Sequence, residues 1–156
     1  MSNEGESKNF IERIIDEDLA EGKYTKIVTL KSGEVVTLRP IRPEDEPALA
    51  RMLQGVSNDS LYMRFFGYIP KITHAWMIRF THIDYDREMA LLAILNEDGK
   101  ERQVGAVRYT QTPDGESVEF ALAVADDWQK CGLGRRLMGA LIDCARQAGF
   151  RSMVGD

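Results

Sequence analysis

Two glycines and several cations lie close together near the C-terminal end of the chain, in the run WQKCGLGRRLMG. Gly132 and Gly134 precede an amphipathic stretch that predicts a helix over residues 134–148. The N-terminus of a helix presents unpaired backbone N–H groups and therefore binds anions. Glycine at that place allows a positive φ and a close approach of the backbone to a ligand. The spacing favours a phosphate-binding loop, and the alternative is an ordinary glycine-containing turn before a helix.

The charges next to these glycines agree with an anion, but two common phosphate loops do not fit. Arg135 and Arg136 stand in the first helical turn, where the helix dipole disfavours cations unless an anion is bound. A Walker loop needs Lys and then Ser or Thr after its second glycine, and a dinucleotide fingerprint needs a small residue where Leu137 stands. The loop therefore belongs to neither class.

Strands and helices must hold this loop in place, and the apolar pattern predicts where they lie. Three strand-like runs joined by short turns predict an antiparallel meander, and a last strand follows the helix through a right-handed parallel crossover. We expect strands at residues 27–30, 35–38, 89–95, 103–110, 118–125 and 151–154, and helices at residues 10–19, after Pro43, and at residues 57–66, 73–80 and 134–148.

Composition limits the kind of protein and its partners. The 156 residues suit one globular domain, and the net charge of −5 argues against a nucleic-acid partner. No apolar run is long enough for a membrane span, and no signal peptide is visible. Cys131 and Cys144 form neither a disulfide framework nor a metal-ligand spacing, so we expect a cytoplasmic protein. His82-x-Asp84-x-Asp86 has no fourth ligand to support it, so we expect no metal.

The pattern Gln129-x-x-Gly132-x-Gly134, between an apolar strand and a helix, resembles the GNAT superfamily of acyl-CoA-dependent N-acetyltransferases. The stretches LRPIRPEDEPAL and IDYDREMALLA resemble the acetyltransferase domain of bacterial protein-lysine acetyltransferases. The resemblance runs from about Leu30 to the end of the chain. It implies an α/β (α+β) fold, a mixed and mostly antiparallel sheet with helices on both faces.

The resemblance also implies how acetyl-CoA would bind. The backbone of Leu122 and Val124 would hydrogen-bond the pantetheine arm, which requires their strand to part from the next strand and leave a slot. The CoA pyrophosphate would be held by five backbone amides, those of Gln129, Lys130, Gly132, Gly134 and Arg135.

Glu119 is the candidate general base. In the predicted strand 118–125, alternation places Glu119, Ala121 and Ala123 on one face, which the alanines would leave roomy. An attacking amine must lose a proton, and in bacterial relatives a Glu at this place in the strand is the proposed base. Glu116, in the turn before this strand, is a second and weaker candidate, and the alternative is that Glu119 is a solvated Glu on a half-exposed strand.

Both ends of the chain depart from the GNAT pattern. Residues 1–26 predict a helical extension before a GNAT domain at 27–156, and the run from Asn9 to Lys23 resembles the opening of bacterial glutaminyl-tRNA synthetases. The family normally continues after Val154 with a helix and two strands, so we expect a C-terminally incomplete domain. That helix often carries a Tyr proposed as the general acid, and no residue here takes this role.

The function expected from these residues is acetyl-CoA-dependent N-acetyl transfer to a protein lysine or a related primary amine. Two alternatives remain open. One is a non-catalytic acyl-CoA-binding sensor module, and the other is an incomplete fragment that assembles as a homodimer.

Overall fold

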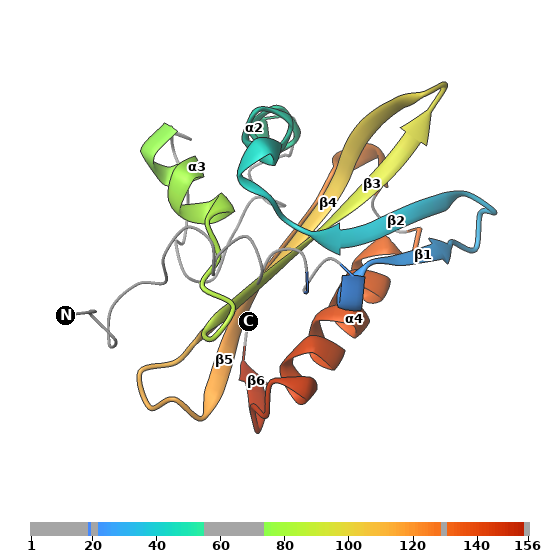
Figure 1. Ribbon diagram of the computed structural model, residues 1–156. Coiled ribbons are helices and arrows are strands. Elements are labelled where there is room, and N and C mark those ends of the chain that lie inside the picture. The colour runs from blue at the N-terminus through green and yellow to red at the C-terminus, as the bar shows by residue number, and fades with distance from the viewer. Residues whose placement is uncertain (1–18, 20–21, 55–73, 129–130, 155–156) are drawn as a thin grey trace.

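One six-stranded sheet organises the chain in the computed structural model, which describes residues 19, 22–54, 74–128 and 131–154 (Figure 1). The spatial order of the strands is their order in the chain, and every neighbouring pair is antiparallel except β5 and β6. The strands are β1 (Lys26–Thr29), β2 (Val35–Pro40), β3 (Glu88–Glu97), β4 (Lys100–Gln111), β5 (Ser117–Val124) and β6 (Ser152–Val154).

Helices cover both faces of this sheet. α2 (Glu46–Gln54) and α3 (His74–Thr81) lie on one face, and α4 (Leu133–Gln147) crosses the other (Figure 1). Two short 3-10 helices, η1 (Pro43–Asp45) and η2 (Asp126–Trp128), lead into α2 and away from β5. The predicted mixed sheet with helices on both faces is therefore confirmed.

The core on the α4 face follows from the helical spacing of leucines. Leu133, Leu137 and Leu141 recur every four residues along α4 and are fully buried against the sheet. A Cβ added to Gly105 of β4 would lie 2.8 Å from Cδ1 of Leu137, so the glycine lets the helix approach the strand closely.

A β-bulge separates the two halves of β4. Ala93 of β3 pairs with Gly105, whereas the next residue, Ile94, pairs with Gln103, so Val104 is the extra residue. The Val104 carbonyl accepts the N–H of Ala125 over 2.9 Å, which ties the bulge to the segment just after β5.

Some predicted elements shift or fall outside the described residues. The helix predicted after Pro43 divides into η1 and α2, and the one predicted at 73–80 is α3. The helix predicted at residues 57–66 lies outside the described residues, as does almost all of the one at 10–19. The division into an extension at 1–26 and a domain at 27–156 stays a prediction.

Candidate functional site

β5 and β6 are parallel neighbours in the sheet. Their parallel register covers Ser117 with Ser152, Val118 with Met153 and Glu119 with Val154. β5 runs on to Val124, whereas β6 ends at Val154, so within the described residues the two strands share only their first part (Figure 1). The parallel neighbour that the sequence predicts is thus present, and Glu119 is the last residue of β5 in this pairing. The separation of the two strands at Leu122 and Val124 stays a prediction.

The N-terminus of α4 has the backbone geometry of an anion site. Its N-cap is Gly132, at φ 90° and ψ −1°, a left-handed conformation that favours glycine. The Arg136 N–H bonds to the Gly132 carbonyl over 3.2 Å, so it closes the first turn. The amides of Leu133, Gly134 and Arg135 come before it and have no acceptor within the helix. The helix begins one residue earlier than the predicted Gly134, and sequence reasoning missed the Leu133 amide.

Gly134 joins the loop to the strand. A Cβ added there would lie 3.5 Å from Cδ2 of Leu122 and 3.9 Å from Cγ2 of Val124, so the first turn of α4 stands directly over the end of β5. Of the two glycines, Gly132 has the positive φ and Gly134 does not. Gly132 is therefore explained by its left-handed backbone conformation. Gly134 is explained by the close packing of the first turn of α4 over the end of β5.

A basic pocket of about 410 Å³ adjoins this helix terminus. It brings the end of β1 and the turn after it against the loop, and it is lined by Thr29, Leu30, Lys31, Cys131, Gly132, Arg135 and Arg136. Lys31, Arg135 and Arg136 place three cations around the open amides, which favours a phosphate-bearing ligand. Sequence reasoning missed Lys31, because nothing local in the turn Lys31-Ser32-Gly33 points to a helix so distant along the chain.

Three further loop residues were singled out in the sequence. Gln129 and Lys130, predicted to offer backbone amides, lie outside the described residues. Cys131 is half-buried in the pocket, and its thiol donates to the Trp128 carbonyl over 2.7 Å.

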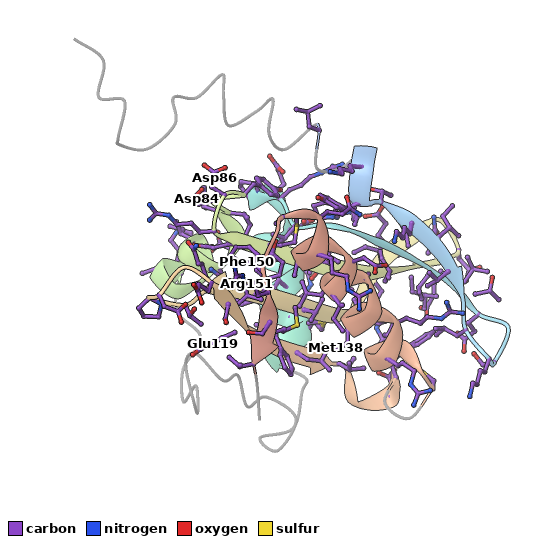
Figure 2. All side chains as sticks on the ribbon, turned by 90° about the horizontal axis from the view of Figure 1, so that it is seen from below. Asp84, Asp86, Glu119, Met138, Phe150 and Arg151 are labelled. Atoms are coloured by element: carbon purple, nitrogen blue, oxygen red, sulfur yellow. The ribbon has the colours of Figure 1, made fainter. Side chains whose placement is uncertain are left out.

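Glu119 lies on the sheet face that α2 and α3 cover, at the edge next to β6 (Figure 2). Thr110 of β4 is directly opposite it in register. The Glu119 side chain is half-buried, and its carboxylate makes no hydrogen bond or ion pair with any described residue. Among the described residues, this carboxylate is therefore without a partner beside the last residue pair of β5 and β6.

The alanine face beside Glu119 is filled, contrary to the expectation of a roomy surface. Ala121 and Ala123 are 3% and 1% exposed. Arg108 of β4 pairs in register with Ala121 on one side and Ala90 on the other, and these small neighbours leave space for a guanidinium that is itself buried. Sequence reasoning missed Arg108, although an arginine inside the apolar run from Val104 to Tyr109 was a usable signal.

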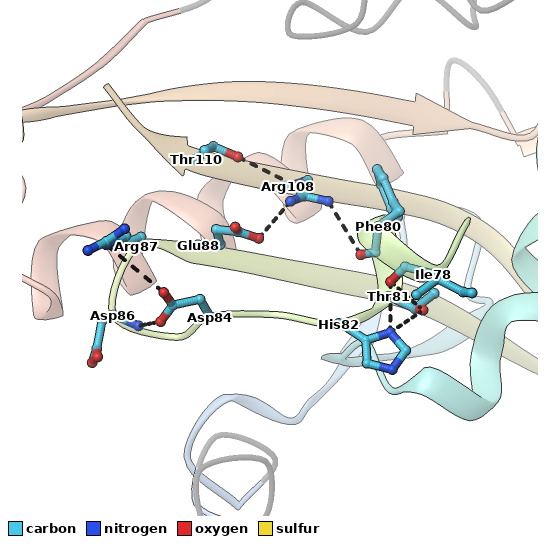
Figure 3. A network of polar contacts seen from close by, with 10 residues as sticks. All are labelled: Ile78, Phe80, Thr81, His82, Asp84, Asp86, Arg87, Glu88, Arg108 and Thr110. Atoms are coloured by element: carbon cyan, nitrogen blue, oxygen red, sulfur yellow. Dashed lines mark hydrogen bonds and ion pairs between the residues drawn. The ribbon is translucent and has the colours of Figure 1, made fainter. Parts of the chain in front are cut away.

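Arg108 binds groups from three elements (Figure 3). Its Nη2 donates to Oε2 of Glu88 over 2.6 Å, its Nη1 to the Phe80 carbonyl over 3.4 Å, and its Nε to Oγ1 of Thr110 over 3.4 Å. The guanidinium also stacks on the Phe80 ring, 4.9 Å from its centroid. Arg108 thus links the end of α3 to the polar row of the sheet that contains Glu119.

The acidic segment before β3 forms a turn. Oδ1 of Asp84 accepts the N–H of Asp86 over 3.2 Å, and the Asp84 carboxylate contacts Arg87 at 4.0 Å (Figure 3). The part of the chain that the structure describes contains no group of three or more side chains suited to a metal ion. Within that same part, no helix has the length and apolarity that crossing a bilayer requires.

Comparison with known proteins agrees with this geometry. The family model described as acetyltransferase (GNAT) family matches residues 57–155. Acetyltransferase PA5475 of Pseudomonas aeruginosa is 37% identical over 127 residues, which are 81% of this chain and 68% of that protein. Acetyltransferase Pat of Mycolicibacterium smegmatis is 31% identical over 128 residues, which are 80% of this chain and 37% of that protein.

Solved structures show the same relation. The GNAT domain of PAT from S. lividans has a TM-score of 0.72 and 28% identity, and the match covers 83% of this chain and 76% of that one. A cAMP-binding acyltransferase from Mycobacterium smegmatis has a TM-score of 0.53 and 26% identity, over 88% of this chain and 43% of that one. These matches, with which the glycine-capped helix agrees, show that the chain belongs to the GNAT family of acetyltransferases.

Proposed function

We propose that this domain transfers the acetyl group of acetyl-CoA to a primary amine, with the lysine side chain of a protein as the acceptor class. The observation that carries the proposal is the half-buried Glu119 carboxylate at the last β5 residue that pairs with β6, which has no hydrogen bond or ion pair with any described residue. The protein-lysine acceptor rests on the resemblance of the chain to bacterial protein-lysine acetyltransferases. The chain spans 68% of one matched relative and 37% of another, so the acceptor is a proposal about this domain alone.

The described residues fit acetyl-CoA, the co-substrate of the GNAT family. Amides at the N-terminus of α4, with Lys31, Arg135 and Arg136 around them, suit its phosphates. Leu122 and Val124 lie next to this terminus, and their backbone would hydrogen-bond the pantetheine arm. Gln129 and Lys130 keep their predicted roles as further amide donors.

Two chemical roles in the transfer fall to particular groups. Glu119 would take the proton that the amine loses as its nitrogen forms a bond to the acyl carbon and the carbon–sulfur bond breaks. The backbone N–H of Leu122 or Val124 would polarise the thioester carbonyl, as an oxyanion donor does. The group that protonates the leaving thiolate is unassigned.

The test separates binding from chemistry in one variant. Titration calorimetry measures acetyl-CoA affinity, and thiol release in the presence of a lysine-containing peptide with a blocked N-terminus measures transfer. Glu119→Gln keeps the side-chain shape and removes the base, so turnover should fall roughly 10²–10⁴-fold while acetyl-CoA affinity is kept.

Glu116→Gln is the matched control. Glu116 is exposed in the turn before β5, and this variant should keep wild-type turnover. Near wild-type turnover of Glu119→Gln would contradict the proposed base. Tight acetyl-CoA binding with no transfer by the wild type would instead favour the acyl-CoA-binding sensor. Activity that rises with protein concentration more steeply than in proportion would favour a homodimer.

A further inference from the structure

We propose that Glu88 is a positioning residue that holds the Arg108 guanidinium and so leaves the Glu119 carboxylate free to accept a proton. The inference rests on the proposed role of Glu119, but the first experiment below needs no turnover. It concerns three charged side chains on the face of the sheet that α2 and α3 cover.

These side chains occupy one small part of the sheet. Glu88 of β3 and Glu119 of β5 are both register partners of Thr110, which lies between them on β4. Since directly paired residues point to the same face, the two glutamates flank Thr110 in a row across three strands. Arg108 is two residues before Thr110, on the same face, so it is the diagonal neighbour of both glutamates.

The carboxylates of Glu88 and Glu119 are therefore both within reach of Arg108, and the guanidinium pairs with one of the two. A diagonal pair in a sheet is separated by about 7–8 Å at its backbone, which long side chains span. Arg108 spans it toward Glu88, with an Nη2 to Oε2 distance of 2.6 Å, whereas Glu119 has no ion pair. Glu119 stands at the equivalent register position on the other side of β4, so the guanidinium could turn to it.

Burial makes this choice energetically important. The Arg108 side chain is 3% exposed, and a buried cation without a carboxylate is strongly unfavourable. Three of its other contacts, to the Phe80 carbonyl, the Thr110 hydroxyl and the Phe80 ring, are with uncharged groups. If Glu88 lost its charge, Glu119 would be the diagonal carboxylate that remains.

The same pairing would affect the reaction in two ways. A carboxylate held by a guanidinium is a weaker proton acceptor, and a cation next to it repels a protonated amine. With Glu88 in place, one cation and two carboxylates leave the surplus negative charge on Glu119, where the acceptor amine must approach.

The first experiment follows the Arg108 Nε–H signal by ¹H–¹⁵N NMR, with Arg108→Lys to assign it. In the wild type, Glu119→Gln should leave this signal in place, because Arg108 is held by Glu88. In the Glu88→Gln background, adding Glu119→Gln should shift the signal, because Arg108 has turned to Glu119. A signal indifferent to Glu119→Gln in that background, with the amide spectrum of a folded protein, would overturn the proposal.

The second experiment uses the lysine-peptide assay. Glu88→Gln should lower kcat about tenfold through the weaker base and leave the KM for acetyl-CoA unchanged. Adding Arg108→Met removes the released cation and keeps much of the side-chain bulk, so kcat should recover toward the wild-type value. A double variant that is no faster than Glu88→Gln would overturn the proposal. If the wild type itself shows no transfer, the proposed function fails, and the NMR comparison still decides the pairing.

Discussion

Both ends of helix α4 carry a glycine with a positive φ, but the terminal backbone groups are satisfied at one end and left open at the other. Gly132 caps the N-terminus at φ 90°, and Gly149 follows the C-terminus at φ 89°. After Gly149, the Phe150 N–H bonds to the Ala145 carbonyl over 3.1 Å and the Gly149 N–H to the Arg146 carbonyl over 3.0 Å, which is a Schellman motif. At Gly132, no side chain caps the helix.

We therefore expect the C-terminal end of α4 to contribute to stability and its N-terminal end to contribute to ligand binding. The C-terminal end satisfies its own backbone groups and packs Phe150 edge-on against Tyr109, with ring centroids 5.7 Å apart. The N-terminal end leaves its amides open and surrounds them with cations. Substitutions at the first end should therefore change the free energy of unfolding, and substitutions at the second should change ligand affinity.

The largest expected effect is on acetyl-CoA affinity. Gly134→Val would place branched carbons over Leu122 and Val124, between the helix terminus and the end of β5. Losing two hydrogen bonds to phosphate, each worth about 1.5–3 kcal/mol, should weaken binding by about 100-fold or more. Calorimetric titration with acetyl-CoA measures this change.

Gly139→Val is the control for that substitution. It lies on the same helix with no atom near its added Cβ, so affinity should stay at the wild-type value. If both variants bind acetyl-CoA equally well, the N-terminus of α4 is not the phosphate site.

The next effect is on stability at the opposite end. Phe150→Ala removes a half-buried ring and its contact with Tyr109, so the free energy of unfolding should fall by about 2 kcal/mol. Urea denaturation gives this value, and acetyl-CoA affinity of the folded variant should match the wild type. A large loss of affinity would show that the two ends of α4 are not independent.

The two cysteines of this region should differ in access. Cys131 lines the basic pocket, whereas Cys144 is 2% exposed within α4 and burial raises the pKa of its thiol to about 12. At pH 8 Cys144 therefore stays protonated, and iodoacetamide should modify Cys131 much faster. Saturating CoA should slow Cys131 by about tenfold or more, because it covers an accessible thiol.

Peptide mapping by mass spectrometry resolves the two sites. Equal labelling of Cys131 with and without CoA would place the ligand away from this pocket. Rapid labelling of Cys144 would instead indicate that α4 opens from the sheet.

The smallest effect is a matched backbone substitution. Gly149→Ala forces a side chain into the left-handed region, which should lower the free energy of unfolding by about 1–2 kcal/mol, at the low end because the added Cβ meets no atom. Thermal unfolding measures the loss. Unchanged stability would mean that the Schellman motif does not need glycine here.

Local patterns predicted the elements better than the chemistry between them. Alternation in β5, the short turns of the meander and the amphipathic α4 each follow from a few neighbouring residues, so the sheet and the parallel β6 were predictable. The start of α4 was misplaced by one residue, since a left-handed N-cap glycine and a helical glycine look alike in sequence.

The unpredicted part of the site depends on register. Lys31 reaches the loop because the turn after β1 lies over the N-terminus of α4, and Arg108 meets Glu88 because β3 and β4 pair in one particular alignment. A single sequence does not specify such alignments, because a shift of one residue moves a side chain to the opposite face.

The sequential strand order also has a consequence for how the chain folds during synthesis. β2 to β5 each pair with the strand that precedes them in the chain. The β1–β2, β3–β4 and β4–β5 contacts are local and form early as the chain emerges from the ribosome, whereas β2 and β3 pair across residues 41–87. β6 pairs with β5 only after the whole of α4 has been made, through the single parallel crossover. A nascent chain therefore carries the meander of β3 to β5 before β5 gains its parallel neighbour β6 beside Glu119.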